Sequence, residues 1–214
     1  MSELVLHDYW RSSAAYRVRI ALHLKRLAFT QVAVNLLAGE QRDAAYLDLN
    51  PQGLAPTLTV GALRLTQSGA IIEWIEETHP EPPLLPTDAG ERAIVRAMAA
   101  IVGADIHPLN NLRVQQVLRG ELAASDAAVS AWIHRWMNDG FTALEALVSE
   151  HGGRFAFGGA PTLADCFIVP QIYSADRFGV DMGPYPAIAR VTANARAHPA
   201  FIAAHPDKQP DKPA

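Results

Sequence analysis

Cysteine is nearly absent from this sequence. Its 214 residues include only Cys166, and a single thiol can form neither an internal disulfide nor a metal site built from several cysteines. Cys166 precedes Phe167 and other apolar residues, so we expect a small buried side chain and not a nucleophile. The eight histidines show no H-E-x-x-H or Cys/His ligand spacing, and we therefore expect no metal site.

Long apolar runs and basic clusters are missing as well. No stretch reaches the roughly 18–20 apolar residues that span a bilayer, and the first residues lack the apolar segment of a signal peptide. The formal net charge is −4, and no basic run provides the electrostatic footprint of a nucleic-acid-binding protein. With half of its residues hydrophobic, the chain is expected to be a cytoplasmic globular protein that binds neither membrane nor nucleic acid.

Two parts of different character make up the chain. Of its 37 alanines, 26 follow residue 85, so the second part favours helix more strongly. In the first part we expect strands at 4–6, 29–34, 57–60 and 63–65. We expect helices at 15–25, 42–49 and 68–78. This β-α-β-α-β-β-α order suits a small α/β domain. The proline-rich segment 79–86 marks a linker, so we place the domains at residues 1–84 and 85–214.

Helical periodicity dominates the second part. We expect helices at 88–118, with a break near Gly103 or Pro108, and at 126–150, 162–175 and 185–197. Thr162 and Asp165 have the spacing of a capping box, in which each side chain bonds the backbone amide of the other residue. Residues 206–214 are expected to be disordered.

The segment 10–20 carries the most informative pattern. Ser12 and Ser13 stand between the expected strand 4–6 and the expected helix 15–25. One of them can cap the helix, and two hydroxyls together with the free amides of a helix N-terminus also form an anion site. A thiolate held there would have a depressed pKa. Because the chain offers no thiol at this point, the sulfur would have to arrive with a ligand.

Two further segments could meet a ligand. Pro56 precedes an expected strand, and the start of a strand alone explains a proline there. A cis Ala55–Pro56 bond would instead present the backbone of Ala55 to a peptide-like ligand, although only about 5–6% of X–Pro bonds are cis. Gln67 and Ser68 begin the next expected helix, where they could cap it or hold a ligand carboxylate.

The order of these elements and motifs resembles the glutathione transferase family, most closely its zeta class, which includes maleylacetoacetate and maleylpyruvate isomerases. The similar segments are R-S-S-A-A-Y-R-V-R-I-A-L (11–22), N-P-Q-G-L-A-P-T-L (50–58), Q-S-G-A-I-I-E-W (67–74), D-I-H-P-L-N-N-L-R (105–113), P-T-L-A-D-C (161–166) and V-P-Q-I-Y-S-A-D-R-F-G-V-D (169–181). The resemblance covers nearly the whole chain. It implies an α/β thioredoxin-like N-terminal domain plus an all-α C-terminal domain, assembled as a homodimer.

The resemblance also implies that glutathione is the cofactor. Ser12 would hydrogen-bond its thiolate, Ala55 would pair with its cysteinyl backbone, and Ser68 would help to hold its γ-glutamyl carboxylate. The full set implied to contact glutathione is Ser12, Ser13, Ala14, Ala15, Gln41, Ala55, Pro56, Gln67, Ser68, His107 and Asn111. The class commonly has Ser-Ser-Cys-Ser where this chain has Ser-Ser-Ala-Ala at 12–15, which argues against a mechanism through an enzyme thiol.

Three arginines in the similar segments, Arg11, Arg113 and Arg177, suit a substrate with carboxylates, because an arginine fork binds a carboxylate through two hydrogen bonds. The alternative is that they are solvated or salt-bridged, the usual fate of this residue. Arg11 adjoins the serine pair and is expected to act in catalysis. On an ideal helix Arg113 lies about 120° around from His107. Both therefore face one cleft only if Pro108 distorts the helix or two subunits share the site.

We expect glutathione-dependent cis–trans isomerisation of a maleyl diketo acid, and the arginines favour maleylpyruvate over maleylacetoacetate as the substrate. A second possibility is a glutathione transferase that conjugates or dehalogenates small electrophiles such as α-haloacids with the same thiolate. A third is a non-catalytic binding module with this fold. Stoichiometric loss of glutathione would indicate the second, and failure to bind glutathione would indicate the third.

Overall fold

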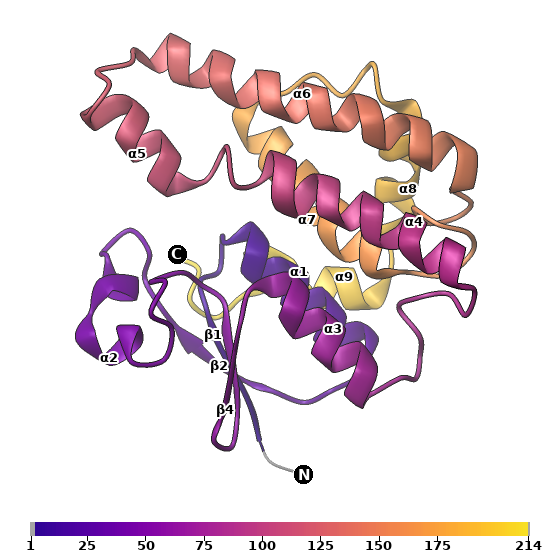
Figure 1. Cartoon of the computed structure of the whole chain (residues 1–214), viewed down its shortest axis with the longest axis horizontal. Helices are drawn as coiled ribbons and strands as arrows, with labels where there is room; N and C mark the ends of the chain where they lie inside the picture. Colours follow the sequence, from indigo (N-terminus) through magenta and orange to yellow (C-terminus); the bar gives the residue numbers. More distant parts are fainter. Residues whose placement is uncertain (1–2, 214) are drawn as a thin grey trace. The chain divides into compact units, whose positions relative to one another are not determined.

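The structure is a computed structural model that describes residues 3–213 (Figure 1). The chain divides into two compact units. The first combines the residues up to Leu84 with the C-terminal segment from Ala197, and the second is Leu85–Arg196. The division after Leu84 falls in the expected linker, whereas the segment 197–214, expected in the second domain, belongs to the first unit.

A four-stranded sheet forms the centre of the first unit. Its strands, in the spatial order β2-β1-β3-β4, are β1 (Leu4–Asp8), β2 (Thr30–Ala33), β3 (Thr57–Val60) and β4 (Leu63–Thr66). β1 runs parallel to β2 and antiparallel to β3, and β3 forms a hairpin with β4. Gly61 in the hairpin turn has a φ of 59°, a left-handed conformation that glycine adopts without a Cβ clash. This is the thioredoxin-like arrangement that the resemblance implies.

Three helices complete the part of the first unit before the linker: α1 (Ser13–Leu24), α2 (Ala44–Leu47) and α3 (Ser68–Thr78). α1 is buried along most of its length because it packs against both α3 and the C-terminal helix α9 (Pro199–Ala204). The helix expected at 42–49 is shorter than predicted. The apolar residues of α1 and α3 fill the core between the helices and the sheet.

The C-terminal segment is ordered through residue 213, so the expectation of disorder at 206–214 is wrong for the described residues. Pro206–Lys208 forms a 3₁₀ turn, η3. The buried Gln209 donates through Nε2 to the carbonyl oxygens of Ala203 at 3.1 Å and His205 at 2.8 Å. This segment is rich in proline and charged residues, and it shows no apolar periodicity. Its order comes instead from polar side chains that find backbone partners.

Helices make up the second unit: α4 (Ala89–Ala100), α5 (Leu112–Gly120), α6 (Asp126–His151), α7 (Leu163–Phe178) and α8 (Pro186–Arg196). The helix expected at 88–118 is broken where predicted, near Gly103 and Pro108, by the π-helical turn η2 (Ile101–Ile106) and by residues 107–111. Gly140 of α6 permits close packing at this turn, since a Cβ there would lie 2.3 Å from a side-chain atom of Ile106. Among the described helices, none is long and apolar enough to cross a membrane.

The expected capping box opens α7. Asp165 Oδ2 accepts hydrogen bonds from the backbone N of Thr162 at 2.8 Å and from its hydroxyl at 3.0 Å. Oδ1 accepts one from the backbone N of Ala156 at 2.8 Å. Burial raises the pKa of Asp165 to about 6. The next residue, Cys166, is also buried, as predicted for a core side chain.

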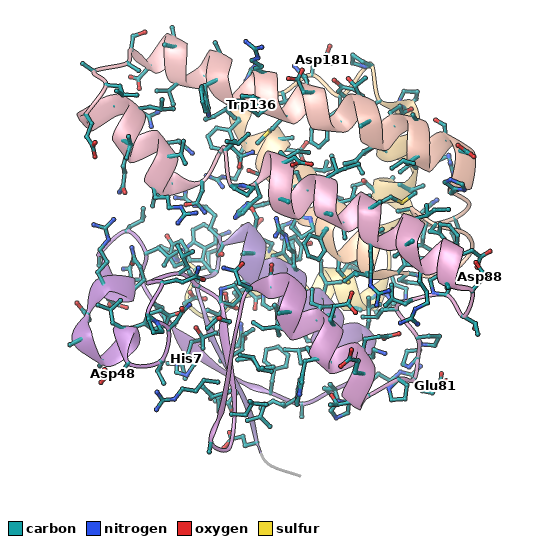
Figure 2. All side chains as sticks on the ribbon, in the orientation of Figure 1. His7, Asp48, Glu81, Asp88, Trp136 and Asp181 are labelled. Atoms are coloured by element: carbon teal, nitrogen blue, oxygen red, sulfur yellow. The ribbon has the colours of Figure 1, made fainter. Side chains whose placement is uncertain are left out.

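Replacing this buried capping residue should destabilise the protein far more than replacing an exposed one. Asp88 caps α4 at the surface, where its Oδ1 accepts from the backbone N of Glu91 at 3.0 Å (Figure 2). Asp165→Ala leaves three buried donors without their acceptor and should lower the free energy of unfolding by about 3 kcal/mol or more. Asp88→Ala should cost about 1 kcal/mol. Denaturant unfolding measures both, and equal losses would contradict this account of the buried box.

Candidate active site

Three predicted site segments of the first unit lie at one edge of the sheet. The strand register aligns the end of β1 with the start of β3 and the end of β4, through His7, Thr57 and Thr66. At these three strand ends lie, in turn, Ser12, Ala55–Pro56 and Gln67–Ser68. The fold therefore brings together residues that are more than fifty positions apart in the sequence.

Ser12 caps α1. Its Oγ accepts from the backbone N of Ala15 at 3.2 Å, and the first intrahelical bond runs from Tyr16 N to Ser12 O at 2.9 Å. The amides of Ser13 and Ala14 precede that bond, and the first amides of a helix have no partner within it. Together with the positive end of the helix dipole, these groups form an environment that stabilises an anion.

The Ala55–Pro56 bond is cis, the conformation that would present the backbone of Ala55 to a peptide-like ligand. Leu54, the residue before Ala55, is fixed by hydrogen bonds from two side chains, one on α2 and one in the loop that follows α2. Tyr46 Oη donates to the carbonyl of Leu54 at 2.8 Å, and Asn50 Nδ2 donates to the same oxygen at 2.6 Å. Neither Tyr46 nor Asn50 was among the predicted site residues. Both hold the loop that precedes the cis bond.

Gln67 and Ser68 sit where β4 passes into α3. Gln67 has a φ of 67°, a left-handed conformation that is strained for a residue with a side chain, and its Nε2 donates to Gln52 Oε1 at 2.6 Å. Ser68, the first residue of α3, is buried and accepts a hydrogen bond from Arg17 Nη1 at 3.2 Å. Strained backbone at the start of a helix is typical of functional sites.

Arg17 is a component of this site that the sequence analysis missed. It lies on α1 and is buried, and burial lowers its pKa to about 9. It is therefore still a cation at neutral pH, and its hydrogen bond to the Ser68 hydroxyl places the charge next to Ser68. The signal in the sequence was an arginine on a helix whose other residues are mostly apolar, but such a residue normally extends to the surface.

Gln41 lies in a 3₁₀ turn, η1 (Glu40–Arg42), next to the loop that precedes the cis bond. A Cβ on Gly53 would lie 3.0 Å from the carbonyl oxygen of Gln41, and Gly53 has a φ of 61°. The side-chain oxygen of Gln41 is buried and accepts no hydrogen bond from the residues that the structure describes. An unsatisfied buried acceptor of this kind fits a site for a ligand that donates hydrogen bonds.

The other predicted residues belong to the second unit. His107 directly follows the π-helical turn, and Asn111 caps α5 by accepting from the backbone N of Arg113 at 3.1 Å. Asn111 Nδ2 lies 3.5 Å from His107 Nε2. Because the helix does not continue from 107 to 112, the angle between His107 and Arg113 around an ideal helix axis does not apply.

Two of the predicted arginines are exposed. Arg113 lies in the first turn of α5, whereas Arg177 lies in the last turn of α7, with its guanidinium carbon 5.4 Å from the ring centre of Phe178. Arg11, in the first unit, is half-buried, and its guanidinium carbon lies 5.4 Å from the ring centre of Trp10. The three residues therefore come from three different elements.

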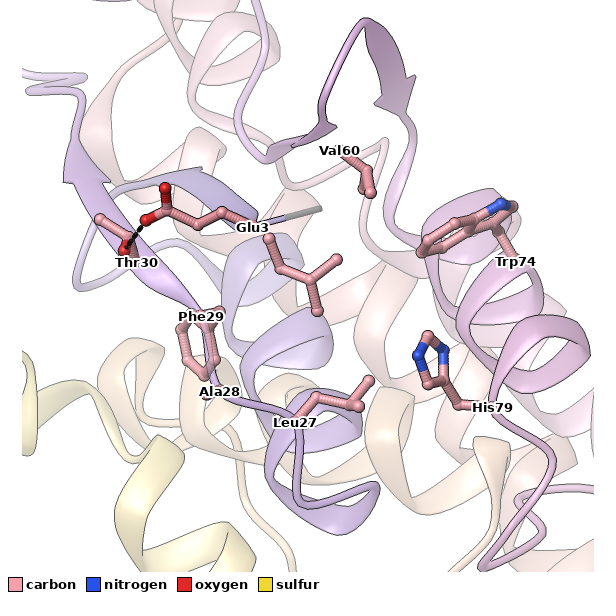
Figure 3. Close-up of a pocket in the computed structure, with 9 residues that line it drawn as sticks. Glu3, Leu27, Ala28, Phe29, Thr30, Val60, Trp74 and His79 are labelled. Atoms are coloured by element: carbon pink, nitrogen blue, oxygen red, sulfur yellow. Dashed lines mark hydrogen bonds between the residues drawn. The ribbon is translucent and has the colours of Figure 1, made fainter. Parts of the chain in front are cut away.

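A separate cavity of about 560 Å³ opens at the opposite edge of the sheet (Figure 3). Its lining includes Leu4 at the start of β1, Val60 at the end of β3, and Trp74 in the second half of α3. None of the predicted site residues lines it. Among residues 3–213, no group of three or more His, Cys, Asp or Glu side chains is arranged to hold a metal ion.

Comparison with protein families accounts for both units. The family model of the glutathione S-transferase N-terminal domain matches residues 6–83, and that of the glutathione S-transferase C-terminal domain matches residues 130–194. The chain belongs to the glutathione S-transferase family. Among curated relatives, the maleylpyruvate isomerase of Ralstonia sp. is 50% identical over 208 residues, which cover 96% of this chain and 98% of that protein.

Solved structures of this family place the chain in the zeta class. The holo structure of a maleylpyruvate isomerase, a bacterial zeta-class glutathione S-transferase, is 49% identical with a TM-score of 0.95 and covers 98% of this chain and 100% of its own. The maleylacetoacetate isomerase of Methylobacterium extorquens AM1, solved with malonate and glutathione, is 37% identical with a TM-score of 0.94. It covers 98% of this chain and 100% of its own.

Proposed function

We propose that this glutathione S-transferase is a glutathione-dependent cis–trans isomerase that converts maleylpyruvate or maleylacetoacetate to the fumaryl isomer. The observation that carries the proposal is the Ser12 site at the start of α1, which suits a thiolate although the chain has no thiol there. Full-length similarity to isomerases of both substrates supports it. The role that we assign to the protein is to bind and activate a thiol that it does not itself contain.

The residues of the site fit glutathione. Ser12 and the amides of Ser13 and Ala14 stabilise the thiolate, which lowers the pKa of the thiol, while the amide of Ala15 holds the Ser12 hydroxyl in place. The backbone of Ala55, beside the cis Pro56, pairs with the cysteinyl residue, and the buried Gln41 oxygen accepts from the peptide. Gln67 and Ser68 hold the γ-glutamyl carboxylate. We assign His107 and Asn111 of the second unit to the remaining contacts.

The chemistry follows from the thiolate. Bound glutathione adds its sulfur to one carbon of the cis double bond, and after rotation about the resulting single bond it leaves again, so that glutathione is regenerated. Addition moves negative charge onto the conjugated carbonyl oxygen, and Arg11 and the helix amides stabilise that charge. Arg11, Arg113 and Arg177 hold the substrate carboxylates as bidentate forks.

Assembly and location are part of the same proposal. We propose a homodimer in the cytoplasm, since the chain belongs to the glutathione S-transferase family. Light scattering on the purified protein measures the mass directly. A mass equal to that of one 23.2 kDa chain would contradict the dimer.

Isomerase activity with catalytic glutathione tests the function. With glutathione at far below the substrate concentration, maleylpyruvate should be converted completely, as followed by ultraviolet absorbance, and the thiol should be fully recovered. Loss of one glutathione per turnover would instead indicate conjugation, and glutathione-dependent halide release from an α-haloacid would indicate dehalogenation. Folded protein that converts neither maleylpyruvate nor maleylacetoacetate would refute the proposal.

The buried Arg17 should affect glutathione binding through its charge and through Ser68. Arg17→Met removes the cation and the donor to the Ser68 hydroxyl, and should raise the KM for glutathione about tenfold, the cost of a hydrogen bond that involves a charged group. A glutathione analogue with an amide in place of the γ-glutamyl α-carboxylate serves as the control. Titration calorimetry should show that the variant loses less affinity for this analogue than for glutathione, and an equal loss for both ligands would contradict the charge effect.

A further inference from the structure

The turn that carries Arg11 and Ser12 is bonded to a carboxylate near the other end of the chain. Ser12 N donates to the carbonyl of Tyr9 at 2.9 Å, which closes a β-turn with Trp10 and Arg11 at its centre. The backbone N of Trp10 donates to Asp211 Oδ2 at 2.8 Å. An amide at this position of a turn has no acceptor within the turn itself, so Asp211 supplies one.

The carbonyl of Trp10 is also bonded to a charged group. It accepts from Arg19 Nη2 at 2.9 Å, and Arg19 forms a buried ion pair with Asp8 at 2.7 Å. Both backbone polar groups of Trp10 therefore bond to ionised side chains, which form shorter and stronger hydrogen bonds than neutral ones. One of these side chains lies on α1, and the other lies on the C-terminal segment.

The segment that presents Asp211 is itself fixed. The side chain of Gln209, buried against the carbonyls of Ala203 and His205, also accepts from Gln31 Nε2 at 2.9 Å. Gln31 lies on β2, so the segment is attached to the sheet as well as to α9. Asp211 therefore reaches Trp10 from an anchored backbone, and the entropy cost of ordering its side chain is small.

We propose that Asp211 is a positioning residue for catalysis, which holds the Arg11–Ser12 turn in place through the backbone of Trp10. The inference rests on the proposed function of Arg11 and Ser12. The Ser12 hydroxyl must lie within hydrogen-bonding distance of the sulfur while the substrate is held beside it, and displacement by about 1 Å can cost a hundredfold in rate. The glutathione peptide is held by other loops, so loss of Asp211 should act on turnover more than on glutathione binding.

Two substitutions of Asp211 separate its geometry from its charge. Asp211→Ala removes the acceptor for Trp10 and should lower kcat about tenfold, with the KM for glutathione changed by less than about twofold. Asp211→Asn keeps an oxygen at the same place and should restore most of the kcat. As a matched control, Asp207→Ala removes a neighbouring carboxylate that pairs with Lys212 at 2.8 Å. It should leave both constants unchanged.

Hydrogen exchange at the Trp10 amide distinguishes failure of this inference from failure of the proposed function. If the wild type isomerises neither substrate, the function is refuted, and faster Trp10 exchange in Asp211→Ala still tests the contact. In an active enzyme, unchanged kcat in Asp211→Ala overturns the inference. It is also overturned if kcat, glutathione affinity and melting temperature all fall together and Asp211→Asn does not rescue turnover, since that pattern indicates only a structural role.

Discussion

The buried ion pair between Arg19 and Asp8 connects the parts of the first unit that hold the Arg11–Ser12 turn in place. Arg19 comes from α1 and Asp8 from the end of β1, and both side chains are almost completely buried. The remaining donors of the guanidinium reach the carbonyls of Trp10 and Ala204. A buried pair is favourable only when such extra hydrogen bonds offset its desolvation. Here they join the sheet, the first helix, the C-terminal segment and the Arg11–Ser12 turn in one network.

The proposed site is surrounded by positive groups, although the net charge of the whole chain is negative. The net charge is −4, yet the start of α1 combines a helix N-terminus with Arg11 and, behind Ser68, with Arg17. These positive groups suit a cofactor that carries a thiolate and carboxylates. The chain's own thiol, Cys166, is buried within α7. The protein thus provides the environment of a thiol enzyme and relies on glutathione for the sulfur.

Local signals were sufficient to predict much of the fold, including the hairpin 57–65, the helix from Ser68 and the capping box before Cys166. Long-range polar contacts were not predictable in this way. The C-terminal segment is ordered by Gln209 and Asp211, whose partners on β2 and in the Arg11–Ser12 turn are distant in sequence. Arginines on a helix indicate a solvated face, so the burial of Arg17 was missed. Roles of individual site residues came from the resemblance rather than from spacing.

The pKa of the glutathione thiol in the complex tests the central claim, that the start of α1 stabilises a borrowed thiolate. Ultraviolet absorbance of the thiolate, titrated against pH, reports that pKa directly. The account predicts a value well below that of free glutathione, by about two units, and a return most of the way toward the free value in Ser12→Ala. A bound thiol that titrates as it does in water, or a Ser12→Ala complex that keeps the full shift, would contradict it.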